Sequence, residues 1–350
     1  MFSAEEYAVL HEGAGLAERS SFGRLLVSGA DRRRYLQGLL TNDIEALAPG
    51  TGCYAAYLTP QGRMIADMRV FETGDVLLVT LDKGVASAVQ ERWMKFVFSE
   101  DVEVTDISGS TAEIGVYGPK AATVLAAALS RVATPDEPSP SQDLLASMAT
   151  YGNSRWSFGG FSLFVLGSDE AGVAGFDVVL PAERKAELQV LLEDSGAAAV
   201  GAAALETTRI EAGRPRFHVD MDEETIPLEA GIEDRAISLT KGCYVGQEIV
   251  IRVLHRGHGR VARRLVGLGL DASAPVPARG DTLRAGPSTG SGRGERDIGS
   301  ITSAVYSPRM ARPIALGYVH RDFVEPGTSV RVLHDGTDYP AIVASRPFAG

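Results

Sequence analysis

The stretch of the chain that decides the fold is 52–81, which reads GCYAAYLTPQGRMIADMRVFETGDVLLVTL. Three runs of β-prone residues, Gly52–Thr59, Met64–Phe71 and Val76–Leu81, are separated by short turns that contain Pro, Gly or Asp. Strands that follow one another across such short turns pair in antiparallel order. The stretch therefore predicts an antiparallel meander.

Helical periodicity appears on both sides of this meander. One helix is predicted over 31–40, and a second has Val85, Val89, Trp93 and Phe96 on one face. The later part of the chain predicts helices over 119–132 (with Pro119 at the first helical position), 182–194 and 202–212, and strands over 161–166 and 176–180. From about Val261 onward, β-prone runs with Pro and Gly replace the helical pattern. The expected class is α+β.

Composition limits the function classes. The 350 residues include 34 Lys and Arg against 45 Asp and Glu, a formal net charge of −11, which argues against nucleic acid or an anionic membrane as the main partner. Only two cysteines, Cys53 and Cys243, are present, too few for a disulfide framework. Glu5 and Glu6 stand where a signal peptide would carry positive charge. We expect a soluble, cytoplasmic protein with no membrane segment.

The length and the change of pattern predict the domain organisation. At about 150 residues per domain, the chain has room for two or three domains. We expect a region of one or two subdomains over 1–258, with a flexible loop near 134–142, and a β domain over 259–350. A run rich in Gly and Ser predicts a mobile loop near 286–296.

Asp67 is the first candidate functional residue. It lies within the predicted strand 64–71, and Asp is depleted in strands. By the two-residue period of a strand, Arg69 shares its face. Two interpretations remain open: a surface ion pair with Arg69, or a carboxylate in a pocket that binds a ligand amine or holds a proton.

The second candidate is the segment Lys241–Glu248, Lys-Gly-Cys-Tyr-Val-Gly-Gln-Glu. An ammonium two residues before a thiol favours the thiolate of Cys243, and the glycines allow close approach of a partner to the backbone. The alternative is that Cys243 is an inert packing residue. No Cys or His partner stands at metal-ligand spacing, so we expect no metal site.

Charge reverses locally after this segment. Between Arg252 and Arg264 the chain carries several Arg and His residues and no acid. Arg252, Arg256 and Arg260 are candidates for binding an anionic ligand tail or an anionic partner, and the alternative is a solvated surface. The acidic residues Asp220, Asp222, Glu223 and Glu224 lack the spacing of an EF-hand, and a solvated loop is predicted there.

Lys241–Glu248 closely resembles the signature of the YgfZ-type folate-binding proteins, a branch of the glycine-cleavage T-protein (aminomethyltransferase) superfamily. The similarity to the T-protein extends over most of the chain, through segments 40–43, 62–67, 117–121, 175–181, 209–213, 315–319 and 345–348. It implies an aminomethyltransferase-like folate-binding region of antiparallel sheets and packed helices, followed by a small C-terminal β-barrel. It also implies tetrahydrofolate or a one-carbon derivative as the ligand.

The resemblance further implies roles for individual residues. Asp67 and Cys243 would be catalytic, and Asp67 would also contact the folate. The other implied contacts to the folate are Asp177, Arg209, Glu211, Lys241 and Tyr244. Aminomethyltransferases have a pair of Asp where this chain has Ala66-Asp67, a Glu in place of Asp177, and an Arg in place of Leu205; they lack Cys243.

These departures favour the YgfZ-type branch. The expected function is a tetrahydrofolate-binding protein that supports iron–sulfur cluster assembly or repair, with iron–sulfur proteins or their assembly factors as partners. The alternative is a folate-dependent aminomethyltransferase that moves a one-carbon unit from a lipoyl carrier protein to tetrahydrofolate.

Overall fold

The chain forms two compact units. The structure is a computed structural model that describes residues 3–256, 260–285 and 296–348, with the side chains of His255 and Arg256 left out. The first unit consists of Met1–Leu58, Ile65–Leu205 and Arg235–Val245, and the second of Thr59–Met64, Glu206–Asp234 and Gly246–Gly350.

The first unit contains a five-stranded sheet in the order β3-β4-β5-β2-β6. Its strands are β2 (Phe22–Ser28), β3 (Gly52–Leu58), β4 (Met64–Glu72), β5 (Leu77–Asp82) and β6 (Glu103–Asp106). β3, β4 and β5 are neighbours in the sheet, and the β4–β5 pair is antiparallel. The meander predicted from 52–81 is therefore present.

A six-stranded sheet, in the order β11-β1-β7-β10-β9-β8, completes the strands of this unit. Its strands are β1 (Gly15–Glu18), β7 (Thr111–Tyr117), β8 (Asn153–Phe158), β9 (Phe161–Ser168), β10 (Gly175–Pro181) and β11 (Ala198–Ala199). All its pairs are antiparallel except β1 with β11.

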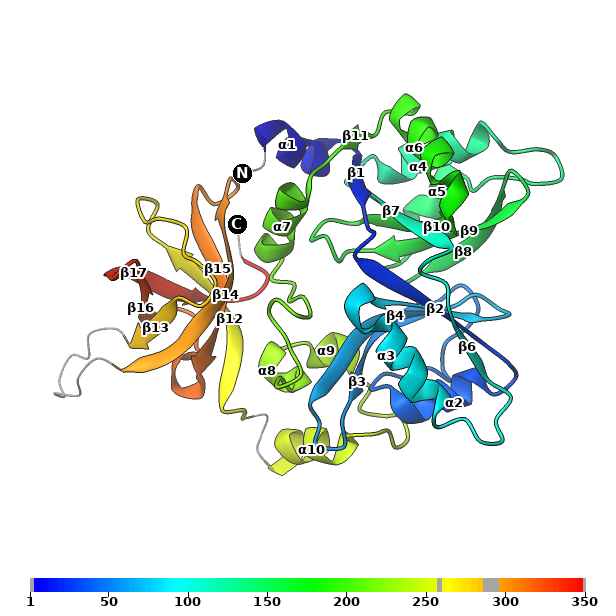
Figure 1. Ribbon diagram of the computed structural model, residues 1–350. Helices are drawn as coiled ribbons and strands as arrows, with labels where there is room; N and C mark the ends of the chain where they lie inside the picture. The colour runs from blue at the N-terminus through cyan, green and yellow to red at the C-terminus, as the bar shows by residue number, and fades with distance from the viewer. Residues whose placement is uncertain (1–2, 257–259, 286–295, 349–350) are drawn as a thin grey trace. The chain divides into compact units, whose positions relative to one another are not determined.

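Helices cover one face of each sheet (Figure 1). α2 (Arg32–Leu39) and α3 (Lys83–Met94) pack on the five-stranded sheet through a core that includes Leu36 and Trp93. The six-stranded sheet is covered by α4 (Ala121–Ser130), α5 (Gln142–Ala146) and α6 (Lys185–Asp194), with η1 (Ala182–Arg184) before α6. α4 begins after Pro119, later than predicted, and the N–H of its N-cap residue Lys120 donates to the Gly13 carbonyl.

Two other helices follow the sequence closely. α1 (Ala4–Glu12) begins with a capping box in which Ser3 and Glu6 bond each other's backbone N–H groups. α7 (Ala202–Glu211) is followed two residues later by Gly213, whose φ of 64° is the left-handed conformation that glycine adopts readily. Loop 134–141 has no helix or strand.

The two sheets of the first unit face each other across a mixed interface. Its apolar part contains Phe71 and Leu78 from one sheet and Phe164, Leu166 and Val179 from the other. Beside this cluster lies a buried ionic network: Arg24, Arg69, Glu113 and Asp177 are each 2% exposed or less. Hydrophobic contact and paired charge together hold the sheets face to face.

Arg69 is the central member of this network. Its guanidinium bonds Asp177 and lies 3.1 Å from Glu113 Oε1, and Arg24 lies 3.5 Å from Glu113 Oε2. Burial by itself would raise the pKa of Asp177, but the charges of Arg69 and Arg19 outweigh it and hold that pKa below its usual value. The network therefore keeps Asp177 ionised.

A second anchor is the segment 235–245, which Lys241 fastens to the end of α2. The Lys241 ammonium donates to the carbonyl oxygens of Gln37, Leu40 and Asn42 at 2.7, 2.6 and 2.8 Å. A cation at a helix C-terminus satisfies carbonyls that have no partner within the helix. Thr41 Oγ1 adds a 2.6 Å bond to the Ala236 carbonyl.

The second unit contains a closed six-stranded barrel in the order β12-β15-β14-β13-β16-β17, drawn in yellow to red in Figure 1. Its strands are β12 (Arg263–Leu270), β13 (Thr282–Ala285), β14 (Asp297–Ser307), β15 (Arg312–His320), β16 (Ser329–His334) and β17 (Thr337–Ala344). The remaining short helices of the chain are α8 (Pro227–Ala230), α9 (Glu233–Ala236), α10 (Gln247–Ile251), η2 (Arg252–Arg256) and η3 (Arg321–Phe323). The predicted loop near 286–296 falls almost wholly outside the described residues.

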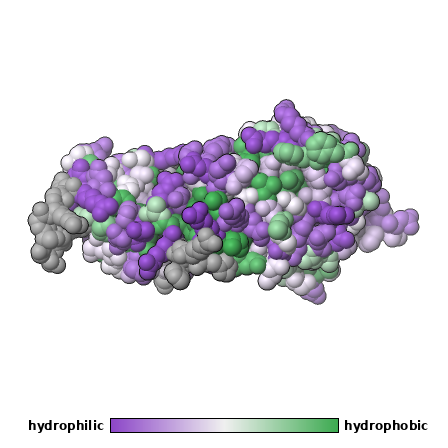
Figure 2. Space-filling view, turned by 90° about the horizontal axis from the view of Figure 1, so that it is seen from below, coloured by the Kyte–Doolittle hydropathy of each residue, from purple (hydrophilic) through white to green (hydrophobic). Residues whose placement is uncertain are grey.

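The surface has no single dominant apolar patch on the face in Figure 2, where hydrophobic residues form small groups among hydrophilic ones. None of the helices in the described ranges is long and apolar enough to span a bilayer.

We expect Arg69→Met to lower the free energy of unfolding by about 3–5 kcal/mol, because it leaves Asp177 and Glu113 as buried charges without their main partner. Urea denaturation measures this. The control is Arg155→Met, which removes the exposed Arg155–Asp75 ion pair and should cost about 1 kcal/mol or less. An equal loss of unfolding free energy in the two variants would show that the buried network stabilises the fold no more than an exposed ion pair does.

We expect Lys241→Met to lower the free energy of unfolding by about 2–4 kcal/mol, because three carbonyl oxygens lose a charged donor. Lys120→Met, at an exposed lysine, is the matched control and should change it by less than about 0.5 kcal/mol. The same denaturation measurement applies, and an unchanged Lys241→Met protein would contradict the anchoring role.

Candidate functional site

Asp67 lies on one face of β4 together with Ile65, Arg69 and Phe71. Along this face Ile65 and Asp67 are partly exposed, whereas Arg69 and Phe71 are buried between the sheets. Asp67 thus stands where the covered part of the strand ends. The interpretation as a surface pair with Arg69 is wrong, because Arg69 is directed at Asp177 and Glu113.

The Asp67 carboxylate is held by a tyrosine. The Tyr54 hydroxyl, on β3, donates a 2.6 Å hydrogen bond to Asp67 Oδ2. Burial raises the pKa of Asp67 to about 6, although the bond from Tyr54 acts in the opposite direction by stabilising the anion. At neutral pH this carboxylate is ionised, yet it takes up a proton far more readily than an ordinary Asp.

Aromatic and charged groups surround Tyr54. Its ring stacks with that of Tyr151 at a centroid distance of 6.5 Å, and the Arg235 guanidinium lies 4.9 Å from the Tyr54 centroid. Arg235 also pairs with Glu170 at 2.7 Å and bonds the Tyr151 hydroxyl. Tyr151 has a φ of 65°, uncommon for a bulky residue and typical of functional or strained sites.

Sequence reasoning missed Tyr54, Tyr151, Glu170 and Arg235. Tyr54 had one usable signal: in neighbouring antiparallel strands it could oppose Asp67. The other three come from distant parts of the chain, and nothing in their local pattern connects them with β4.

Asp177 is less accessible than a residue predicted to contact folate would have to be. It is fully buried in β10, and its carboxylate already accepts hydrogen bonds from Tyr117 and Arg69. A folate contact at Asp177 stays a prediction, and a ligand would have to displace one of these donors to reach it.

Lys241 and Cys243 have different surroundings: the ammonium is bonded within the protein and the thiol is exposed. All three hydrogens of the Lys241 ammonium are directed at backbone carbonyls. The thiol of Cys243 is exposed, whereas Cys53 is more enclosed, and burial raises the pKa of the Cys53 thiol to about 12. Of the two cysteines, Cys243 is the one within reach of a partner.

Tyr244 is buried, and its hydroxyl has no hydrogen-bond partner within the described ranges. Burial raises the pKa of this hydroxyl to about 12, so it is a donor at neutral pH. The Lys241 ammonium lies 5.1 Å from the centre of the Tyr244 ring. An unpaired buried hydroxyl is a group that a bound polar molecule would satisfy.

Arg209 and Glu211 are engaged within the second unit. Arg209 bonds Asp220 Oδ2 at 2.7 Å and Ser303 Oγ at 2.9 Å, and Glu211 accepts a bond from the Ser307 hydroxyl. The prediction of a solvated acidic loop is therefore wrong for Asp220, which is 2% exposed and serves as a buried partner of Arg209. Asp222, Glu223 and Glu224 are exposed, as predicted.

The positively charged stretch is described in part. Arg252 is exposed at the start of η2, and Arg260 is exposed at the edge of a cavity. The side chain of Arg256 lies outside the described residues. Among the residues that the structure describes, no group of three or more His, Cys, Asp or Glu is arranged to hold a metal ion.

Two domain families match most of the chain. Residues 1–241 match the GCVT N-terminal domain, and residues 263–349 match the glycine cleavage T-protein C-terminal barrel domain. The predicted boundary at 258–259 falls between these two matches and remains a prediction.

Similar proteins share one description. The aminomethyltransferase of Cutibacterium acnes is 30% identical, over 99% of this chain and 89% of its own length. That of Nostoc sp. is 28% identical, over 98% of this chain and 86% of its own length. The glycine cleavage system aminomethyltransferase T of Bartonella henselae superposes with a TM-score of 0.83 at 25% identity, covering 99% of this chain and 89% of that structure. The chain belongs to the glycine cleavage T-protein family.

Proposed function

We propose that this protein binds tetrahydrofolate and moves a one-carbon unit to it, as a folate-dependent aminomethyltransferase. The relatives named aminomethyltransferase support this function over the iron–sulfur function that the sequence departures favoured. The observation that carries the proposal is Asp67: a partly buried carboxylate, positioned by Tyr54, with a pKa near 6. Such a group suits proton transfer at neutral pH.

The transfer itself defines what the protein must do. The methylene of an aminomethyl-lipoyl group forms bonds to two folate nitrogens, while its bonds to sulfur and to the amine break. The two N–H protons lost by the folate end on the thiol and on ammonia. Asp67 would accept one such proton and pass it on, and Tyr54 would keep the carboxylate oriented throughout.

Two residues of the first unit fit a folate best. Asp67 supplies an acceptor for a ring N–H, and Tyr244 supplies a buried hydroxyl without a partner in the described ranges. The other residues proposed from the resemblance, Asp177, Arg209, Glu211 and Lys241, already have protein partners. We propose that Asp177 and Lys241 support the site within the first unit. The folate contacts expected at Arg209 and Glu211 stay predictions.

Ala66 and Leu205 stand where aminomethyltransferases have Asp and Arg, and the second replacement counts more strongly against this proposal than the first. Ala66 is buried on the opposite face of β4 from Asp67, in the core with α2 and α3, so a carboxylate lost there leaves the surroundings of Asp67 unchanged. Leu205 packs against an apolar cluster that includes Leu10 and Tyr117. A cation is absent from that position, which is the main departure from the aminomethyltransferase pattern.

A second function rests on Cys243. Its thiol is exposed within the octapeptide that resembles the YgfZ-type signature, and Lys241 fixes the backbone two residues away. A tetrahydrofolate-binding protein that supports iron–sulfur cluster assembly or repair would present this thiol to an iron–sulfur protein or an assembly factor.

One assay separates the two functions. The purified protein is mixed with tetrahydrofolate and an aminomethyl-lipoyl carrier protein, and the formation of methylene-tetrahydrofolate is measured. We expect turnover that falls at least ~100-fold in Asp67→Asn, the size of effect expected for a lost general base, and stays within about twofold in Cys243→Ala. Folate binding without turnover, with iron–sulfur enzyme activity lost in cells carrying Cys243→Ala, would favour the second function.

The protonation of Asp67 gives a further prediction. A carbon-detected NMR titration should find a pKa of about 6 for Asp67, and Tyr54→Phe should raise it further because the anion loses its donor. Between about pH 4 and pH 6 the folded chain binds more protons at Asp67 than the unfolded chain, so this residue makes the free energy of unfolding fall as pH rises. Asp67→Asn should remove that part of the fall. A measured Asp67 pKa near 4 that does not change in Tyr54→Phe would contradict the site geometry.

A further inference from the structure

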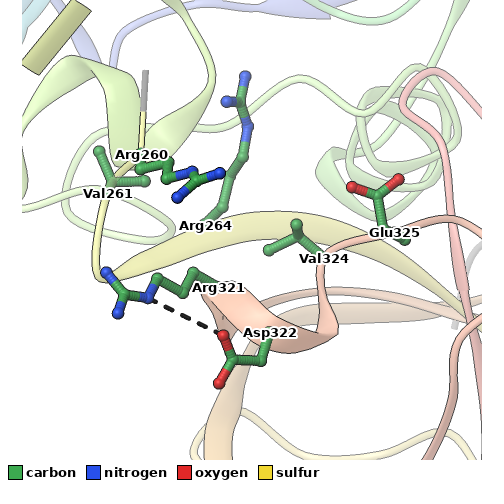
Figure 3. Close-up of a pocket in the computed structure, with 7 residues that line it drawn as sticks. All are labelled: Arg260, Val261, Arg264, Arg321, Asp322, Val324 and Glu325. Carbon is green, nitrogen blue, oxygen red and sulfur yellow. Dashed lines mark ion pairs between the residues drawn. The ribbon is translucent and has the colours of Figure 1, made fainter. Parts of the chain in front are cut away.

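Three arginine side chains border one cavity of the second unit (Figure 3). The cavity has a volume of about 480 Å³, within the range of small-molecule sites. It is lined by Arg260, Val261, Arg264, Arg321, Asp322, Val324 and Glu325. Nothing in the proposed one-carbon transfer uses this cavity.

The barrel brings these residues together by strand pairing. β12 and β15 are antiparallel, with Arg263 opposite His320 and Arg264 opposite Val319. Just beyond the pair, the Arg321 N–H donates to the Ala262 carbonyl at 3.1 Å. The chain entering β12 and the chain leaving β15 are thus held side by side, and arginines from both line the cavity.

The arginines are unevenly paired. Arg264 has a close partner, because its guanidinium lies 2.6 Å from Glu233 Oε1. Arg321 is exposed, and its Nε lies 3.9 Å from Asp322 Oδ1, at the limit of an ion pair. Arg260 is exposed and has no ion pair among the described residues. Two guanidinium groups that line the cavity therefore have donors accessible to a ligand.

We propose that this cavity binds a small phosphomonoester. The planar fork of an arginine matches phosphate oxygens with two parallel hydrogen bonds, and Arg260 and Arg321 have those donors available. Val261 and Val324 supply apolar contact for a short carbon skeleton. In Figure 3, Glu325 lies on the other side of Val324 from the arginines, where its carboxylate can accept a bond from a hydroxyl of the ligand.

The test uses the full chain and three probes, glycerol 3-phosphate, inorganic phosphate and tri-glutamate, in calorimetric titrations at low and high salt. We expect glycerol 3-phosphate to bind, and to bind more weakly at high salt because the contact is ionic. Arg260→Ala and Arg321→Ala should each weaken binding about tenfold, equivalent to ~1.4 kcal/mol. The matched control is Arg309→Ala, at an exposed arginine in the β14–β15 connection, which should leave binding within about twofold.

Melting curves of each variant separate lost binding from lost folding. A variant with both arginines changed to lysine keeps the charge but loses the fork, and should bind glycerol 3-phosphate several-fold more weakly than the unaltered chain. An equal loss in Arg309→Ala would assign the binding to general surface charge and overturn the proposal. So would binding of tri-glutamate in preference to glycerol 3-phosphate, which would make the cavity a carboxylate site. These outcomes do not depend on whether the chain turns over folate.

Discussion

The ion pair between Arg69 and Asp177 joins the two sheets of the first unit, and the geometry around Asp67 depends on it. Buried charges need closely fitting partners, because each loses its hydration on folding. Arg69 meets that need with two carboxylates from β7 and β10, which fixes β4 against the facing sheet. Asp67, two residues earlier on the same face, stands beyond this contact and keeps a carboxylate that can exchange protons. One face of β4 thus carries Arg69, whose charge joins the two sheets, and Asp67, whose carboxylate has a raised pKa.

The strand pattern around Asp67 could be predicted because it is local. The period of two placed Ile65, Asp67, Arg69 and Phe71 on one face, and the short turns at 60–62 and 73–75 indicated the meander. The partner of Arg69 could not be predicted, because Asp177 is 108 residues away and local pattern carries no information about such distances. The burial of Asp220 was missed for the same reason, and the three carbonyl partners of Lys241 could not be predicted either: each residue bonds groups that only the folded chain brings near.

The octapeptide at 241–248 combines a buried anchor with an exposed thiol. Its resemblance to the YgfZ-type signature directed attention to the thiol of Cys243, yet the first residue of the segment works as an anchor for the end of α2. The residues around Tyr54 come from β3, the β8–β9 region and segment 235–245, and they surround the hydroxyl that donates to Asp67. A local motif is easier to recognise in a sequence than a group of residues that comes from distant segments.

The anchor formed by Lys241 has a consequence for synthesis of the chain. Its partner Leu40 precedes it by 201 residues, so the end of α2 waits for most of the polypeptide to leave the ribosome before its carbonyls are satisfied. Closing a loop of that length is slow compared with local pairing. The end of α2 is therefore made early and completed late, because its carbonyl oxygens gain their charged donor only when the Lys241 segment docks.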